Sequence, residues 1–483
     1  MKKLALIALM GMVAAGIAGA ADIEVTENIV TSTTWTADNV YYLQGVIYVE
    51  PGASLTIEPG TLIRGNTAST LVIAKGAQIF ANGRKDAPII MTSMEDDLVT
   101  YRPVSEEWGN LTILGNGIIA ATMDGDGTGQ PDGTDTAQME GLVARFEGDT
   151  FPLYGGDDDD DDSGVVRYVS LRYGGFVLSM ANELNGLSIG GVGRGTDMEY
   201  VEIMNNVDDG IEIWGGTLNI KYFSIWNIGD DSFDVDQGWR GKAQFGLIVQ
   251  GYCGSNSQGS GIGDNIFEMD GAEDASAQPF GTALFYNITA IGQPLDGDQG
   301  TEFRDNMRAQ FHNCIFMDVG DAMIKDGGTS GDGGGYGSAG VPTLLELFNT
   351  PYDEYPTNTA GIDPMVLYPD LTSGNWCDFT NNVFYNLAKT DSLVQFGVMD
   401  EGKGNVIAEN SPIQEIVRED PVVVGGKAMA NVTYLNPRAA NDARHSDHIR
   451  DCGFITPAPY KGAFLDHNWL VGWTAAYAYG MTD

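Results

Sequence analysis

Short runs of alternating apolar and polar residues, separated by glycine-containing turns, begin at Val46 and recur along most of the chain. The segments SLTIEPGTLIRG (54–65) and TLVIAKGAQIFANG (70–83) align at an offset of 16 residues. Alternation of this kind predicts β-strands with one face in a core. Helical periodicity is confined to one short candidate near residues 438–450. We expect positive φ at the glycines that mark the corners, which are Gly60, Gly65, Gly76 and Gly83.

The pattern becomes a repeat in the middle of the chain. EYVEIMNNVDDGIEIWGG (199–216) aligns without a gap on KYFSIWNIGDDSFDVDQG (221–238), at an offset of 22 residues. A repeat of about 20 residues built from short β-branched runs is typical of a solenoid in which each repeat forms one coil. The residues predicted to point inward are Val201, Ile203, Ile211, Ile213, Phe223, Ile225, Phe233 and Val235.

The same alignment stacks acidic residues on acidic residues. Successive coils of a β-solenoid lie roughly 4.8 Å apart, and two carboxylates at that distance repel by about 1 kcal/mol in water and about 3 kcal/mol or more when partly buried. Protons, basic partners or a cation must offset this repulsion, and carboxylate oxygens suit Ca²⁺. The alternative is that the turn residues cap backbone N–H groups. The candidate calcium ligands are Asp208, Asp209, Glu212, Asp230, Asp231 and Asp234.

A second candidate calcium site lies in DGDGTGQPDGTD (124–135), whose spacing is similar to the 12-residue loop of EF-hand and dockerin type. The candidate ligands of this calcium loop are Asp124, Asp126, Thr128, Asp132 and Asp135. The alternative is that the segment is a solvated acidic turn. The run of six aspartates at 157–162 predicts a solvated, flexible loop, with a weak metal site as the alternative.

Length and charge narrow the class of protein. The chain has 483 residues, and residues 1–20 have the basic, apolar and small-residue regions of a secretory signal peptide. Residues 21–483 are predicted to form one solenoid domain with insertions near 120–163 and 327–375, without a membrane span. The net charge of −42 argues against nucleic acid and anionic membranes as partners and favours divalent cations.

Four cysteines in an exported chain allow two disulfides, and buried free thiols are the alternative. No CxxC or Cys-His spacing indicates a zinc site. The cysteines are Cys253, Cys314, Cys377 and Cys452.

WGNLTILGNG (108–117), GGDDDDDDSGVVRYVSLRYGG (155–175) and the two 22-residue repeats carry a resemblance to a known group. The chain resembles secreted bacterial cell-surface proteins with the pectate-lyase-like superfold. That resemblance implies an all-β, right-handed parallel β-helix and export to the periplasm, cell surface or medium, but no particular reaction.

Two functions remain open at this point. The favoured one is a structural or binding role for an exported protein stabilised by Ca²⁺, with a polysaccharide or cell-surface glycan as partner. The alternative is a polysaccharide lyase or glycoside hydrolase acting on the acidic 208–242 face, with Asp209, Asp230, Asp231 and Arg240 as catalytic residues. NIGDDSFDV (227–235) distantly resembles the GDD segment of polygalacturonase-type hydrolases, but the Gly-His-Gly and Arg-Ile-Lys motifs of that family are missing.

Three tryptophans lie near the acidic repeat and offer flat surfaces for sugar rings. The alternative is that they cover the strands. They are Trp214, Trp226 and Trp239.

Overall fold

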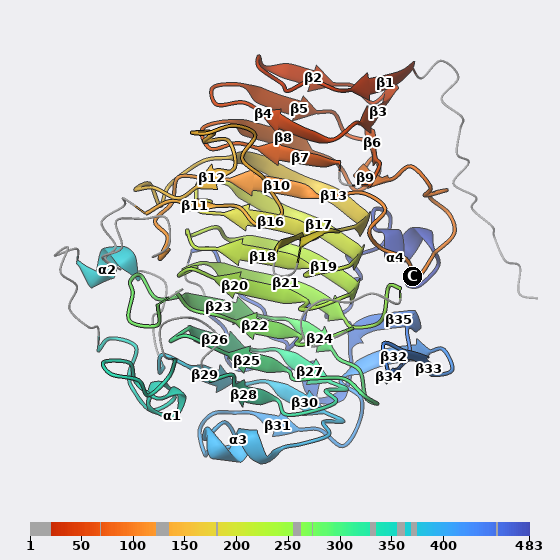
Figure 1. The fold of residues 1–483 in the computed structure, drawn as a ribbon. Coiled ribbons are helices and arrows are strands. Elements are labelled where there is room, and N and C mark those ends of the chain that lie inside the picture. The colour runs from red at the N-terminus through yellow and green to blue at the C-terminus, as the bar shows by residue number, and fades with distance from the viewer. Residues whose placement is uncertain are drawn as a thin grey trace, which may run out of the picture.

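The computed structural model describes residues 21–67, 69–121, 135–179, 182–254, 262–272, 274–328, 335–354, 363–368, 374–450 and 453–483. Within them the chain winds into a parallel β-helix whose coils stack from the red N-terminal strands to the cyan C-terminal coils (Figure 1). The all-β solenoid predicted from the repeats is therefore confirmed.

One face of the β-helix is a sheet of nine parallel strands, each contributed by a different coil. Each strand pairs with its equivalent in the coil above and the coil below, so that residues at equivalent positions stack. In spatial order the strands are β4 (Val46–Val49), β7 (Thr70–Ile73), β10 (Leu111–Leu114), β16 (Leu187–Gly190), β18 (Ile211–Trp214), β20 (Phe233–Asp236), β22 (Phe267–Met269), β25 (Thr301–Phe303) and β28 (Ile324–Asp326).

The other two faces belong to one sheet of 18 strands that bends at a corner. The long central strands cross this corner, so their first halves pair on one face and their second halves on the next. The strands are β1 (Ala21–Val25), β2 (Thr33–Trp35), β3 (Asn39–Leu43), β5 (Ser54–Ile57), β6 (Leu62–Gly65), β8 (Gln78–Asn82), β9 (Ile89–Ser93), β13 (Gly164–Gly174), β17 (Asp197–Asn206), β19 (Ile220–Ile228), β21 (Lys242–Val249), β23 (Thr282–Tyr286), β24 (Thr289–Ile291), β26 (Arg308–His312), β27 (Ile315–Met317), β29 (Asp378–Thr380), β30 (Val383–Tyr385) and β31 (Val406–Ile407).

Left-handed residues form that corner. Tyr168, Tyr200 and Tyr222 have φ values of 49°, 56° and 54°, which bulky residues rarely adopt. Their rings stack at centroid distances of 4.3 and 4.4 Å, which helps to offset the backbone strain. In later coils Asn287 and Asn313 take the corner with φ values of 53° and 55°, a conformation that asparagine tolerates.

The core lies between the three faces and contains all eight residues predicted to point inward. The corner glycines divide into two kinds. Gly60 and Gly76 have φ values of 91° and 81°, as predicted. Gly65 and Gly83 lack positive φ, and the prediction is wrong for them. Glycine is needed at these two positions because neighbouring atoms leave no room for a side chain. A Cβ on residue 65 would lie 2.8 Å from Trp108 Cβ, and a Cβ on residue 83 would lie 2.7 Å from the Tyr168 carbonyl oxygen.

Segments outside the coils cover two sides of the β-helix. The first insertion contains β11 (Ala137–Gln138) and β12 (Leu153–Tyr154), and the next loop contains β14 (Phe176–Ser179) and β15 (Asn182–Leu184). The second insertion contains α1 (Leu344–Leu347) and α2 (Pro364–Leu367).

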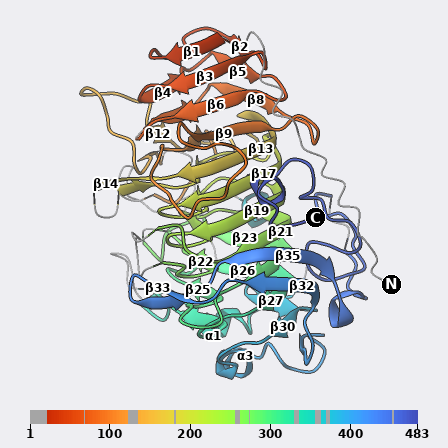
Figure 2. The same cartoon turned by 90° about the vertical axis from the view of Figure 1, so that its right-hand side faces the viewer.

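The C-terminal segment follows α3 (Asp391–Gln395) and lies against the corner of the 18-stranded sheet (Figure 2). It contains β32 (Ile413–Arg418), β33 (Val422–Val424), β34 (Lys427–Met429), β35 (Val432–Ala439) and α4 (Ala475–Ala478). The helix predicted near 438–450 is wrong: only one 3-10 turn forms there, at Asn441–Ala443.

The described cysteines form no disulfide with one another. Cys253, Cys314 and Cys377 are buried free thiols, so the disulfide alternative is wrong for these three; Cys452 lies outside the described residues, as does the predicted signal peptide. Among the described residues, no helix is long and apolar enough to cross a membrane.

Candidate metal centre

Four acidic residues stack in one line on the nine-stranded sheet. Glu212 of β18 pairs with Asp234 of β20, as the repeat predicts. The line then continues to Glu268 of β22 and Glu302 of β25, which sequence reasoning missed. A signal for them existed, because FEM (267–269) and TEF (301–303) place an acid between two buried residues, as IEI and FDV do. We call Glu212, Asp234, Glu268 and Glu302 the strand acids.

The two ends of this line differ in charge. Ser188 of β16 lies before Glu212, and Lys325 of β28 lies after Glu302. The Lys325 ammonium donates to Glu302 Oε2 at 2.8 Å, and Arg304 pairs with Glu268 and, at 3.5 Å, with Asp270. Positive charge therefore balances the later coils, whereas Glu212 and Asp234 have no ion pair among the described residues.

A second set of acids lies in the turn that precedes each of these strands. Asp209 Oδ1 accepts the Asp231 N–H at 2.9 Å, and Asp231 Oδ1 accepts the Asn265 N–H at 2.6 Å. These bonds are the capping bonds proposed above as the alternative, and they tie each coil to the next. They occupy one oxygen of each carboxylate, so capping alone does not account for the full set of acids. We call Asp208, Asp209, Asp230, Asp231 and Asp264 the turn acids.

The turn acids form two clusters among themselves, and a third cluster joins one turn acid to two strand acids. In each cluster, one oxygen per carboxylate lies within 4.8 Å of the others. Two ligands on opposite sides of one Ca²⁺ lie about 4.6–5.2 Å apart, so this spacing fits a shared ion. The clusters are Asp208–Asp209–Asp230, Asp209–Glu212–Asp234 and Asp230–Asp231–Asp264.

Burial makes the clusters costly without a counter-charge. Asp209, Glu212 and Asp234 are only 6–7% exposed. Oδ1 of Asp230 and Oδ1 of Asp234 are buried and have no hydrogen-bond partner among the described residues. Buried polar atoms in proteins are normally satisfied, so these two oxygens are suited to a proton or a cation.

The carboxyl groups are correspondingly hard to ionise. Burial raises the pKa of Asp209 well above its usual value, and the neighbouring Asp208, Asp234 and Asp230 raise it further. Burial and the Asp234 carboxylate do the same to the pKa of Glu212. At neutral pH the clusters therefore hold either protons or a cation.

The first insertion and the loop after it add acids to this site, which are Glu140 and, in β15, Glu183. Glu140 and Glu183 both raise the pKa of Asp208, after burial as the main cause. Of the predicted 12-residue calcium loop, Asp124, Asp126, Thr128 and Asp132 lie outside the described residues. Asp135 is 3% exposed and lies just before β11.

The catalytic set proposed for the alternative function is not assembled. Arg240 is 1% exposed and donates to both oxygens of Asp159, at 2.6 and 2.7 Å, instead of facing Asp209, Asp230 or Asp231. It also donates to the carbonyl oxygens of Ile118 and Leu367. Asp159 consequently holds Arg240, whereas Arg304 is the arginine that lies beside the acids, paired with Glu268 and Asp270.

The aspartate run at 157–162 is exposed at four of its six positions, as its charge predicts, but Asp159 and Asp161 are partly buried and bonded to the coils. Burial opposes ionisation of Asp159, but Arg240 outweighs it and holds the pKa of Asp159 below its usual value. Asp161 accepts the Asn116 N–H at 3.1 Å and the Ser163 hydroxyl at 3.0 Å. The run therefore fastens the first insertion to the coils.

The three tryptophans near the acids are not sugar platforms. Trp214 is 5% exposed, and Trp226 and Trp239 are fully buried. Trp239 belongs to the central core, while Trp226 lies beneath the C-terminal segment. The alternative interpretation, in which aromatic residues cover the strands, holds for Trp214 and Trp226.

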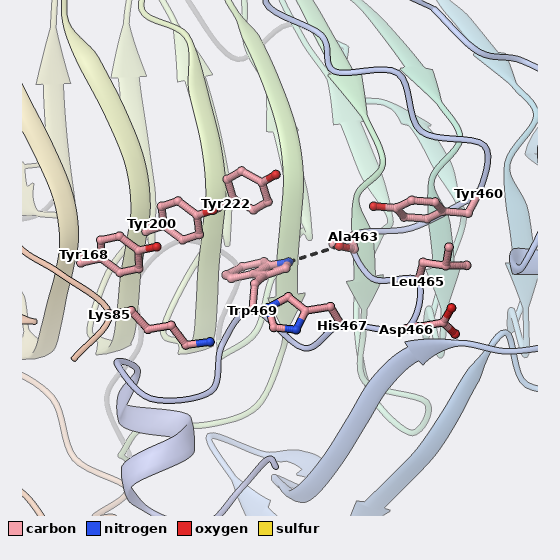
Figure 3. A pocket seen from close by; sticks show the side chains of 10 residues that line it. All are labelled: Lys85, Tyr168, Tyr200, Tyr222, Tyr460, Ala463, Leu465, Asp466, His467 and Trp469. Atoms are coloured by element: carbon pink, nitrogen blue, oxygen red, sulfur yellow. Dashed lines mark hydrogen bonds between the residues drawn. The ribbon is translucent and has the colours of Figure 1, made fainter.

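A different aromatic site lies where the C-terminal segment meets the corner (Figure 3). Tyr168, Tyr200 and Tyr222 stand in a row, and the Trp469 ring meets the last two edge-on at 6.4 and 5.7 Å. Together with Lys85 and others they line a pocket of about 370 Å³. Because the tyrosine rings stack on one another, they present mainly their edges and hydroxyl groups to it.

Stacked parallel coils, an inward apolar core and long insertions define the class of parallel β-helix proteins. Within that class, the family model described as pectate-lyase like beta helix domain matches residues 27–351, and the chain belongs to this family. No curated protein matches the chain.

Proposed function

We propose that this protein is an exported β-helix scaffold that holds Ca²⁺ in its acidic clusters and binds glycans on its surface. The observation that carries the calcium part is the pair of buried oxygens on Asp230 and Asp234 that have no hydrogen-bond partner among the described residues, within clusters of closely spaced carboxylates. Hard oxygen ligands with several negative charges favour Ca²⁺ over transition metals.

A scaffold fits these residues better than a catalyst does. Asp209 and Asp231 are only 7% and 5% exposed, which limits the access of a polymer to their carboxylates. Arg240 is committed to Asp159. Bound Ca²⁺ would instead join adjacent coils, because each cluster draws ligands from at least two of them.

The pocket of Figure 3 is the proposed glycan site. It combines the tyrosine hydroxyls and the Trp469 ring with exposed Asp466 and His467. Pockets for sugars need this mixture of apolar surface and directed polar groups.

Calcium binding is tested by metal analysis and thermal melting. We expect the purified protein to contain Ca²⁺, and its melting temperature to fall in chelator and to recover with Ca²⁺ more than with the same concentration of Mg²⁺. An unchanged melt in chelator, together with no bound metal, would contradict the proposal.

Glycan binding is tested on an array with two matched variants. Tyr200→Phe keeps the ring stack and removes one pocket hydroxyl, so we expect weaker binding. Tyr434→Phe, whose hydroxyl donates to Asp483 instead, is the control. Cleavage of acidic polysaccharides that is lost in Asp230→Asn would establish the enzymatic alternative and overturn the scaffold.

A further inference from the structure

Arg308 is a buried cation that has no carboxylate partner among the described residues. It begins β26, is 4% exposed, and its guanidinium lies between two aromatic rings, with the central carbon 3.2 Å from the Phe280 centroid and 4.7 Å from the Trp376 centroid. Nη2 donates to Asn306 Oδ1 at 3.1 Å. Nε and Nη1 have no hydrogen-bond acceptor among the described residues, and both are shielded from bulk solvent.

The other deeply placed arginines behave differently. Arg172, Arg240 and Arg304 each lie within 4.0 Å of a carboxylate. Burial lowers the pKa of Arg308 to about 10, and the groups that oppose this effect are Tyr368, Cys377 and Tyr336, none of which is a carboxyl group. In a chain with a net charge of −42, a buried guanidinium without a carboxylate is unexpected.

Arg308 forms part of the wall of a pocket of about 430 Å³ beneath the second insertion. The Gln278 side chain also lines this pocket, and its buried Oε1 has no hydrogen-bond partner among the described residues. Pro342 and Leu347 supply apolar surface. The pocket thus offers one positive charge, an amide and apolar walls.

We propose that this pocket binds a small carboxylate-bearing ligand with a compact apolar body, and that the ligand's carboxylate is the missing counter-charge of Arg308. A monoanion fits better than a phosphate or sulfate dianion, because the lining contains a single cation and carries the acidic Glu354 at its exposed rim. The site is separate from both the acidic clusters and the pocket of Figure 3, and it does not depend on the proposed function.

Benzoate is a suitable probe, with benzamide as its uncharged analogue and inorganic phosphate as the competing oxyanion. By calorimetry at neutral pH, we expect benzoate to bind and to raise the melting temperature. Benzamide and phosphate should each bind about tenfold more weakly or worse, because a charge-assisted bond to the guanidinium is lost or mismatched. Equal binding of benzamide, stronger binding of phosphate, or no binding of benzoate would overturn the proposal.

Two variants locate the probe. Arg308→Met keeps an unbranched apolar side chain like the arginine stem, removes the charge and should reduce benzoate affinity about tenfold or more. Ser276→Phe should block the pocket from its exposed rim without touching Arg308. Arg84→Met, which removes an exposed arginine paired with Asp86, controls for net charge. If benzoate binds Ser276→Phe and the wild-type protein equally well, the proposal fails even if Arg308→Met does not fold.

Discussion

At the scale of the residue, one position in the repeat has two roles. Oδ1 of Asp209 accepts a backbone N–H from the next coil, and the same carboxylate lies close to those of Glu212 and Asp234. Turn capping is therefore compatible with the proposed cation binding. Oδ1 of the strand acid Asp234 accepts no backbone N–H among the described residues. A substitution of Asp234 therefore tests cation binding without removing a capping hydrogen bond through this oxygen.

Asp234→Asn should distinguish the effect of carboxylate repulsion on stability from the effect of calcium binding. In chelator we expect unchanged or higher stability, because one buried carboxyl group is removed. A single site at 100 times its dissociation constant contributes about 2.7 kcal/mol, and the variant should lose about 1–2 kcal/mol of that calcium-dependent gain. Chemical denaturation with and without Ca²⁺ measures both effects.

The matched control is Asp420→Asn, which removes an exposed acid. It should leave the calcium-dependent gain unchanged. Equal loss of that gain in both variants would mean that Ca²⁺ acts through general charge screening and not through the clusters.

At the scale of the element, parts distant in sequence are joined by a few buried charges. Glu202 of β17 is fully buried and accepts the backbone N–H groups of Ala475 and Ala476, at the start of α4. Ser170 also donates to it. This carboxylate therefore anchors the C-terminal segment to the corner of the 18-stranded sheet.

Glu202→Gln should loosen that anchor. The amide group replaces one acceptor with a donor, so a backbone N–H of α4 loses its partner at a cost of about 1–3 kcal/mol. We expect faster hydrogen exchange and faster proteolysis in residues 453–483, with the coils unchanged. Uniform destabilisation of all coils would contradict a local anchor.

The Arg240–Asp159 pair has the same role for the first insertion. Arg240→Met removes the closer of the two cations beside Asp159 and leaves only Arg194, at 3.8 Å, which should cost about 3 kcal/mol by chemical denaturation. Adding Asp159→Asn should recover part of this loss, since the poorly balanced charge is then removed. If the double variant is no more stable than the single one, packing and not charge explains the effect.

At the scale of the whole molecule, the net charge of −42 is concentrated unevenly. A long line of carboxylates lies along one face, and the compact fold holds them closer together than an unfolded chain would. Protons should therefore stabilise the fold at low pH, and Ca²⁺ should stabilise it at higher pH, where the carboxyl groups have lost their protons.

The raised pKa values of Asp209 and Glu212 set the sign of this response. The folded protein binds protons more tightly than the unfolded chain, so without metal these groups favour folding at low pH and lose that contribution as pH rises through the raised values. Ca²⁺ competes with protons. The difference in melting temperature between Ca²⁺ and chelator should hence be larger near about pH 8 than near about pH 5. A constant or smaller difference at high pH would contradict calcium binding by these carboxyl groups.

Much of the fold could be predicted because it depends on local periodicity. Ile211 stacks on Phe233, and Glu212 on Asp234, at the offset read from the repeat. Glu268 and Glu302 were missed because loops of varying length break the 22-residue offset, although the strand pattern persists. The Gly65 prediction was wrong because its close contact with Trp108 comes from a distant segment.

The sequence by itself determined the strands, their coil register and the stacking of acid on acid, since a solenoid repeats one local geometry. Only the tertiary structure decided what that stacking means chemically. It buried the acids, joined Arg240 to Asp159 across 81 positions and left Arg308 without a carboxylate among the described residues. The physical reason is that the energy of a charge depends on the water and partners around it, and these are set by segments far away in the chain.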